Sequence, residues 1–283
     1  MKPLTKYFSA RAVAGQLTPF LLLFVLGTGI AAAHEERHDT ITDRTNTELS
    51  EAEQAIRQGE IYRRQSNWDA AIAAFEKARE LGANENTVNL YIGRTWLFAG
   101  DPAKALDYLN RFIKTHPNDV GARQLRANAL ARLDKHQAAA DELQIAIDLQ
   151  ARPPPDLFVA HARQLSSTNP PHTVAALNTL QNGMRLYGPV MSLADETINV
   201  HVQMGEYANA LEVMDGQPEM LRFSAPWLKR RGDIQALAGD DELARETYVQ
   251  AMESLNSLPE HMHSMPDNVK LRKELEEKLA AEE

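Results

Sequence analysis

Five residues near the start of the chain, His34-Glu35-Glu36-Arg37-His38, have the spacing found in zinc peptidases. In such sites two histidines one helical turn apart bind the metal, and the glutamate activates a water molecule. A working site also needs a buried helix, a third ligand and a substrate cleft. This motif lies at a predicted signal-cleavage site without a catalytic domain around it. The pattern therefore does not predict a peptidase.

Histidine and methionine donors at the two ends of the chain suggest a different chemistry, the binding of copper. Cleavage before His34 would place a free amino group beside an imidazole, with His38 nearby. Near the other end stands the run His261-Met262-His263-Ser264-Met265. Copper binding in the cell envelope is thus an alternative function, and the competing interpretation is solvated loops with incidental histidines.

The remaining polar residues indicate no other catalytic chemistry. The sequence has no nucleophile turn, no glycine-rich phosphate loop and no paired carboxylates in a catalytic context. We therefore expect a protein that is not an enzyme and has no cofactor. A net charge of −9 over 283 residues, without a broad basic surface, also argues against nucleic acid as a partner.

Residues 1–33 have the pattern of a secretory signal peptide. Lys2, Lys6 and Arg11 precede an apolar run over residues 20–30, and three alanines follow it before His34. An uncleaved anchor is the alternative, but the run is shorter than the roughly 20 residues that span a bilayer. Cleavage would remove three positive charges and change the net charge from −9 to −12. Because the chain has no cysteine for lipid attachment, we expect a periplasmic or secreted protein without a membrane span.

The elements that must position any site are revealed by alanines at a fixed spacing. They stand 34 residues apart in two runs, joined by one longer step: Ala71, Ala105 and Ala139, then Ala176, Ala210 and Ala244. This is the period of a helix–turn–helix unit repeated along a solenoid. Within a unit, a small residue on each helix allows the two helices to cross closely, as Gly59 and Ala71 would do. Large side chains such as Phe75 then fill the space toward the next unit.

This pattern over residues 52–258 resembles the tetratricopeptide repeat family. The resemblance implies an all-α fold, a right-handed α-solenoid of about six repeats. The fourth unit has its inner turn lengthened by Asn169-Pro170-Pro171-His172, and the fifth departs from the pattern at Ile198 and His201. A last helix starting at Pro266 is expected to cap the array, the alternative being a docking helix for a partner.

Five segments are expected along the chain. They are a signal peptide (1–33), a flexible leader (34–50) that ends in a capping box of Ser50 and Glu53, repeats 1–3 (51–152), degenerate repeats 4–6 (153–258), and a linker with the capping helix (259–283). Pro153-Pro154-Pro155 could separate two sub-arrays. The favoured alternative is an elongated turn within a continuous array, because adjacent repeats must still bury their faces.

The resemblance also implies which residues bind a partner, because the first helix of each repeat lines the concave face. The positions that usually contact ligand are occupied by Arg63, Arg64, Arg94, Asn128, Arg132 and Arg163, and further along by Asn199, Gln203, Lys229 and Asp233. Of these we select Arg63, Arg94, Asn128, Arg132 and Arg163 as the binding set. Guanidinium groups grip carboxylates, so the expected ligand is a peptide or partner subunit with an acidic segment.

Two considerations limit this interpretation. The arginines could instead pair with neighbours such as Glu60 or lie in a solvated face. The chaperone-tail clamp of some family members is not supported, because Ile56 and Glu60 occupy its lysine and asparagine positions. The expected function is a non-catalytic protein–protein interaction scaffold of the cell envelope.

Overall fold

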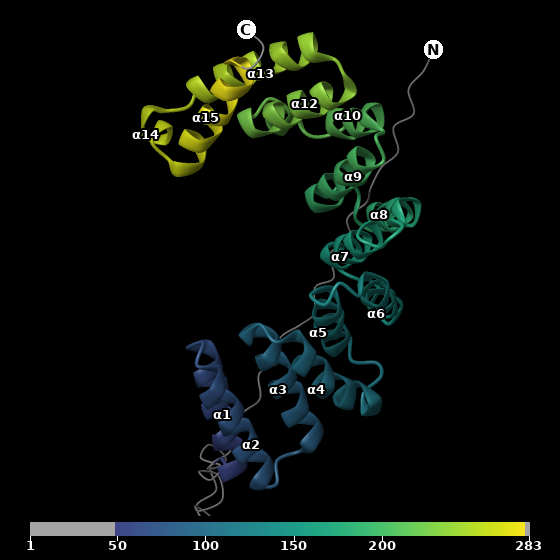
Figure 1. Ribbon diagram of the computed structural model, residues 1–283, viewed down its shortest axis with the longest axis vertical. Helices are drawn as coiled ribbons and strands as arrows, with labels where there is room; N and C mark the ends of the chain where they lie inside the picture. The colour runs from purple at the N-terminus through teal and green to yellow at the C-terminus, as the bar shows by residue number, and fades with distance from the viewer. Residues whose placement is uncertain (1–48, 281–283) are drawn as a thin grey trace, which may run out of the picture. The chain divides into compact units, whose positions relative to one another are not determined.

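The computed structural model describes residues 49–280, and this part of the chain consists of helices joined by short turns (Figure 1). Six helical hairpins follow one another. Their first helices are α1 (Glu51–Arg64), α3 (Glu85–Ala99), α5 (Val120–Ala131), α7 (Pro155–Ser166), α9 (Met191–Gln203) and α12 (Ala225–Ala238). Their second helices are α2 (Trp68–Glu80), α4 (Pro102–Thr115), α6 (His136–Asp148), α8 (Thr173–Tyr187), α10 (Tyr207–Asp215) and α13 (Asp241–Asn256). Three more helices are α11 (Glu219–Arg222), α14 (Glu260–His263) and α15 (Pro266–Ala280).

The hairpins stack in chain order. Each first helix packs on the second helix of its own hairpin, and second helices such as α2, α4 and α6 pack on the first helix of the next. First helices also contact each other directly where α3 meets α5 and where α7 meets α9. The prediction of an all-α solenoid with about six repeats is confirmed.

The six regularly spaced alanines lie where helices cross, and all of them have an exposed fraction of 0%. The crossing is close because the first helix offers a small residue there. A Cβ added to Gly59 would lie 2.4 Å from the Phe75 ring, and one added to Gly232 would lie 2.5 Å from the Tyr248 ring. Glycine at these positions is therefore required by the packing of an aromatic ring against the backbone.

The ends of the helices follow from local sequence. Ser50 and Glu53 form the predicted capping box of α1, each side chain bonding the other residue's backbone N–H. Between α3 and α4, Gly100 has a φ of 91°, and Asp101 accepts a hydrogen bond from the Lys104 N–H at 3.0 Å. A left-handed glycine followed by an N-cap aspartate explains the sharp turn.

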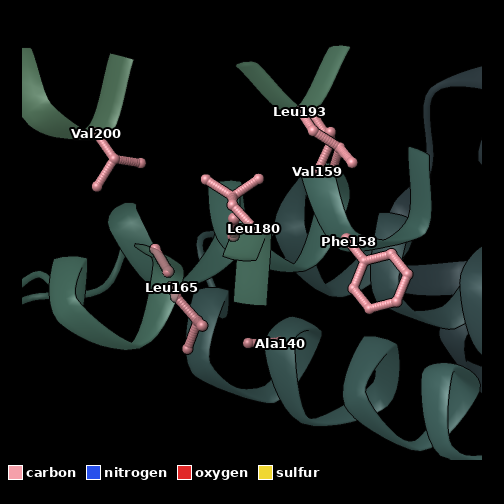
Figure 2. Packing of buried hydrophobic residues seen from close by; sticks show 9 residues of the cluster. Ala140, Phe158, Val159, Leu165, Leu180, Leu193 and Val200 are labelled. Carbon is pink, nitrogen blue, oxygen red and sulfur yellow. The ribbon is translucent and has the colours of Figure 1, made fainter. Parts of the chain in front are cut away.

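The core continues across the three prolines. Pro155 begins α7, and α6 packs on α7. Ala140 of α6 belongs to the same buried cluster as Phe158 of α7, Leu180 of α8 and Leu193 of α9 (Figure 2). The proline segment is therefore an elongated turn between hairpins that share a core.

The C-terminal helix α15 closes the last hairpin. Leu271 and Leu275 pack with Tyr248 and Ala251 of α13 in one buried cluster. Lys229 of α12 forms an ion pair with Glu274 at 3.2 Å. The prediction of a capping helix is confirmed, because the apolar side of α15 covers the end of the array.

The fifth hairpin departs from the repeat pattern, as the sequence indicated. Ile198 stands where other repeats carry a small residue, and it is buried against Met214. Helix α10 has only 9 residues, and the short helix α11 follows it before α12. A larger side chain at the crossing thus coincides with a shorter second helix and an additional link.

Some sequence predictions concern residues that the structure does not describe. The signal peptide, the cleavage site and the motif at residues 34–38 all lie outside residues 49–280, as does the leader up to residue 48. Among the described helices, none combines the length and the apolar character needed to cross a membrane.

Candidate partner-binding face

Three of the predicted binding arginines, Arg63, Arg94 and Arg163, lie on first helices, and Glu60 engages two of them. Arg63 Nη2 is 2.9 Å from Glu60 Oε2 within α1, and Arg94 Nη2 of α3 is 2.6 Å from Glu60 Oε1. Burial would raise the pKa of Glu60, but the hydrogen bond from Arg63 and the charge of Arg94 outweigh it and lower that pKa. Arg63 and Arg94 are thus held by a carboxylate of the protein itself, which is the alternative that the sequence left open.

Further contacts of this kind join other first helices. Arg132, just after α5, donates from Nη1 to the Leu97 carbonyl of α3 at 2.8 Å. Arg163 of α7 donates from Nε to Glu196 of α9 at 2.7 Å. Each of these contacts connects one repeat to an adjacent one, so the arginines stabilise the stacking of hairpins.

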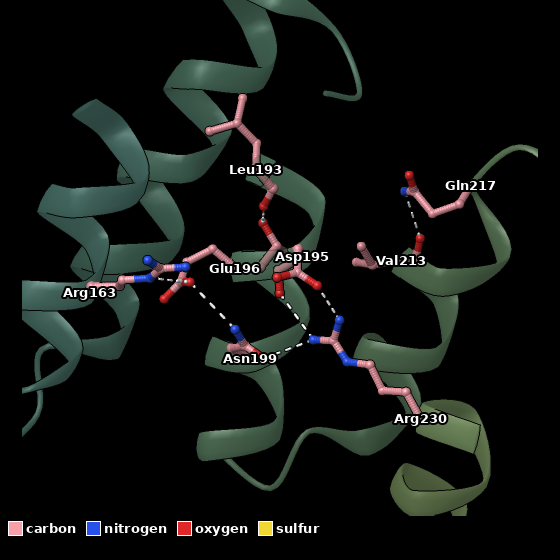
Figure 3. Close-up of polar contacts among 9 residues, drawn as sticks. Arg163, Leu193, Asp195, Glu196, Asn199, Val213, Gln217 and Arg230 are labelled. Atoms are coloured by element: carbon pink, nitrogen blue, oxygen red, sulfur yellow. Dashed lines mark hydrogen bonds and ion pairs between the residues drawn. The ribbon is translucent and has the colours of Figure 1, made fainter. Parts of the chain in front are cut away.

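Figure 3 shows one such network, which links α7, α9 and α12. Asn199 donates to Glu196 at 3.4 Å and accepts a hydrogen bond from Arg230 at 2.8 Å. Arg230 also forms an ion pair with Asp195. Gln203, Lys229 and Asp233, the other late candidates, are likewise bonded within the protein. These candidates therefore belong to inter-helix networks.

Helices α5 and α7 differ from these pairs. No hydrogen bond or ion pair joins them within residues 49–280, and a pocket of about 670 Å³ opens beside them, which we call the α5–α7 pocket. Its apolar lining consists of Ala127, Ala131, Leu143, Pro154, Leu157 and Ala160. Its polar lining consists of Gln124, Asn128, Arg132, His136, Asp156 and Gln164. An apolar floor with a few polar groups at the edge is typical of a binding site.

A second, smaller hollow of about 420 Å³ lies between α3 and α5. Gln124 and Asn128 line both hollows, and Arg94 lines the smaller one. Both amide side chains are exposed, and neither forms a hydrogen bond with any other described residue. Because their donors and acceptors are available, they can bond to the backbone of a bound chain.

The structure thus divides the predicted binding set. Asn128 and Arg132 line the α5–α7 pocket and Arg94 reaches the smaller hollow, whereas Arg63 and Arg163 line neither. Whether any of them binds a partner stays a prediction. Sequence reasoning missed Gln124, although it lies on the first helix of its repeat, four residues before the candidate Asn128. Sequence reasoning also missed Ala131 and Ala160, because small residues on these helices indicate close helix packing and not ligand binding.

The alternative function, copper binding, receives no further support from the described residues. Among the described residues, no group of three or more His, Asp or Glu side chains is placed to hold a metal ion. Within the histidine and methionine run, the His263 ring lies 2.7 Å from the Leu258 carbonyl oxygen.

Comparisons with known proteins agree with this architecture. A family model described as "Tetratricopeptide repeat" matches residues 56–120 and 90–154. A tetratricopeptide repeat protein from Parabacteroides merdae is similar at 15% identity, with 80% of this chain and 84% of that chain covered and a TM-score of 0.50. MamA from Desulfovibrio magneticus is similar at 19% identity, with 62% and 97% covered and a TM-score of 0.50. Likeness at these identities shows the fold. A comparison with curated proteins found no match.

Proposed function

We propose that this chain is a tetratricopeptide repeat protein and acts as a non-catalytic protein-interaction scaffold whose binding site is centred on the α5–α7 pocket, because residues 56–154 match the family model and six helical hairpins follow one another. Repeats of this family present their first helices to protein or peptide partners. The pocket is lined mainly by the first helices of the third and fourth hairpins, and no hydrogen bond or ion pair joins α5 to α7 in the part of the chain that the structure describes. This opening is the observation that carries the proposal.

The lining of the pocket indicates the chemistry of the ligand. Ala127, Ala131 and Ala160 leave room for an apolar side chain of the partner. Gln124 and Asn128 stand beside it with available amide groups, which suits the backbone of an extended segment. Burial of the anchor supplies most of the affinity, and the amides fix its direction.

Arg132 favours a partner with an acidic residue next to that anchor. Its contact within the described part of the chain is to the Leu97 carbonyl, which leaves its positive charge without a carboxylate. Arg63 and Arg94 share Glu60 and are less available. We therefore assign to Arg132, and not to Arg63 or Arg94, the site's preference for an acidic residue in the partner.

The cell envelope is part of the same proposal. Residues 1–33 have the pattern of an export signal, and the chain contains no cysteine. The described residues do not bear on this localisation, so it is tested separately. Fractionation of cells that express the full chain should place the processed protein outside the cytoplasm, and an unprocessed cytoplasmic protein would contradict this part.

The binding site is tested by selecting ligands from a displayed library of random peptides. We expect the selected peptides to share an apolar residue beside Asp or Glu. Asn128→Ala should weaken their Kd about five- to tenfold, because about 1 kcal/mol of hydrogen bonding is lost. Ala160→Phe, which fills the pocket, should weaken binding more strongly.

Two matched variants control for general effects of substitution. Asn178 on α8 is exposed, and so is Ala103 on α4. Asn178→Ala and Ala103→Phe should leave the Kd unchanged. Selected peptides that bind Asn128→Ala and Ala160→Phe as tightly as the parent would show that the site lies elsewhere.

A further inference from the structure

The link between the fifth and sixth hairpins exposes two large apolar side chains. In residues 219–223, which we call the α11 segment, Met220 is 91% exposed and Phe223 is 58% exposed. They are three positions apart, so they lie on the same side of this helical turn. Leu221 packs instead against the buried cluster that contains Met214 and Trp227. The segment is thus anchored by one side chain and presents two others to the solvent.

The charges of the α11 segment are also available. Glu219 is exposed and forms no ion pair within the described part of the chain. Arg222 lies over the Phe223 ring, with its guanidinium carbon 5.9 Å from the ring centre, and pairs with no carboxylate among the described residues. The segment therefore combines two apolar side chains with one negative and one positive group.

The α5–α7 pocket offers the complement of this arrangement. Its floor is formed by alanine and leucine side chains, and Arg132 and Asp156 are among its polar residues. Asp156 is exposed and has no ion-pair partner within residues 49–280. One cation and one anion beside an apolar hollow match one anion and one cation beside an apolar pair.

We propose that the α5–α7 pocket of one copy of this protein binds the α11 segment of a second copy. Met220 and Phe223 enter the apolar floor, Glu219 faces Arg132, and Arg222 faces Asp156. This inference rests on the proposed function, because it names the partner that occupies the same pocket. Burial of two large apolar side chains is its main driving force.

The contact joins two different surfaces, so after two copies bind, one of them still has a free segment and the other still has a free pocket. Such a heterologous interface yields a series of oligomers unless its rotation closes a ring. Self-association that increases with concentration is the direct consequence.

Sedimentation velocity of the protein over a range of concentrations tests this self-association. We expect the wild-type protein to form a series of species larger than a monomer. The variant Met220→Ser/Phe223→Ser loses the segment's apolar pair, and Ala160→Phe fills the pocket, so each should remain monomeric. Both changes are at exposed or half-buried positions, and a circular dichroism melt verifies that each variant is folded.

Mixing the two variants gives the sharpest result. The first still has an open pocket and the second still has an intact segment, so together they should form a dimer and nothing larger. Val174→Ser/Leu186→Ser removes two other exposed apolar side chains, from α8, and should associate like the wild type. A monomeric wild type, variants that still associate, or a mixture that stays monomeric would each overturn the proposal.

A labelled peptide of residues 217–225 measures the contact without assembly. It should bind the segment-deficient Met220→Ser/Phe223→Ser protein, and Ala160→Phe added to that protein should weaken the Kd at least about tenfold. A peptide that fails to bind, while library peptides still depend on Asn128, overturns this inference and leaves the proposed function intact. Library peptides that bind Asn128→Ala and Ala160→Phe as tightly as the parent would overturn the proposed function itself.

Discussion

Arg94 and Glu60 are separated by 34 residues, one full repeat, and their side chains meet at 2.6 Å between α3 and α1. Asn128 lies another 34 residues along, at the equivalent place on α5. The same position therefore supplies a carboxylate, a guanidinium and a free amide in successive repeats. The carboxylate of Glu60 and the guanidinium of Arg94 pair with each other between stacked hairpins. The amide of Asn128 remains available beside the α5–α7 pocket.

Replacing Glu60 should destabilise the first two repeats. Glu60→Ala leaves Arg63 and Arg94 without their shared carboxylate, and we expect a loss of about 1–2 kcal/mol in the free energy of unfolding. Urea unfolding followed by circular dichroism measures it. The exposed pair of Lys77 and Glu80 provides the control, since Glu80→Ala should change stability by less than about 0.5 kcal/mol. Equal effects of the two changes would contradict a structural role for Glu60.

Enlarging Ala105 should overpack a helix crossing. Ala105 has an exposed fraction of 0%, and its carbonyl oxygen lies only 3.3 Å from the Cβ position of Gly93. Ala105→Leu should therefore cost about 1–3 kcal/mol. Ala103→Leu, on the exposed side of the same helix, should be nearly neutral. A melting temperature of Ala105→Leu within error of the parent would show that the repeat register is wrong.

Removing the cap should expose the last hairpin. Leu275 of α15 has an exposed fraction of 0% in a cluster with Tyr248 and Leu255. Leu275→Ala should destabilise the protein by about 2–5 kcal/mol, through lost burial and the cavity that remains. Val269→Ala, at an exposed position of the same helix, should have little effect. If thermal melts of the two variants coincide, α15 contributes no cap.

His161 should make stability depend on pH. It is 6% exposed, its Nδ1 lies 3.1 Å from Thr179 Oγ1, and burial lowers its pKa against the opposing charges of Asp141 and Asp148. The folded protein then binds this proton less readily than the unfolded chain, whose pKa is about 6.5. The contribution to stability is complete above that pH and decreases as the pH falls below it.

Urea titrations at a series of pH values reveal this contribution by comparison with His161→Gln. The difference between parent and variant in the free energy of unfolding should shrink as the pH falls from 7.5 to 5.5, as expected for a group that resists protonation. Asn178→Ala, an exposed change that alters no titratable group, should show no such trend. A difference that is constant with pH would rule out a buried neutral His161.

The repeat architecture could be predicted from sequence because close helix crossings demand small residues at fixed intervals. The six alanines at this spacing, the first being Ala71 and the last Ala244, therefore predict the repeats. Pro266 predicts the start of the capping helix. The binding face could not be predicted to the same depth. Whether Arg94 is available depends on the side-chain conformation that brings it to Glu60, and neither residue type nor spacing specifies this.

The pocket escaped prediction for a related reason. Its lining combines residues of α5, α6 and α7 with Pro154 of the turn before α7, and the sequence shows only that this turn is long. The sequence identified Arg132 as a candidate. Asp156 and Ala160 become candidates only because the structure places them in the lining of the pocket.

Alanine methyl NMR of the protein, titrated with a selected peptide, tests the central claim most directly. Ala127, Ala131 and Ala160 line the α5–α7 pocket, whereas Ala103 and Ala208 are exposed on α4 and α10. If the pocket is the partner-binding site, the first three methyl signals shift with saturation at the measured Kd and the last two stay in place. Saturable shifts confined to other methyl groups would contradict it.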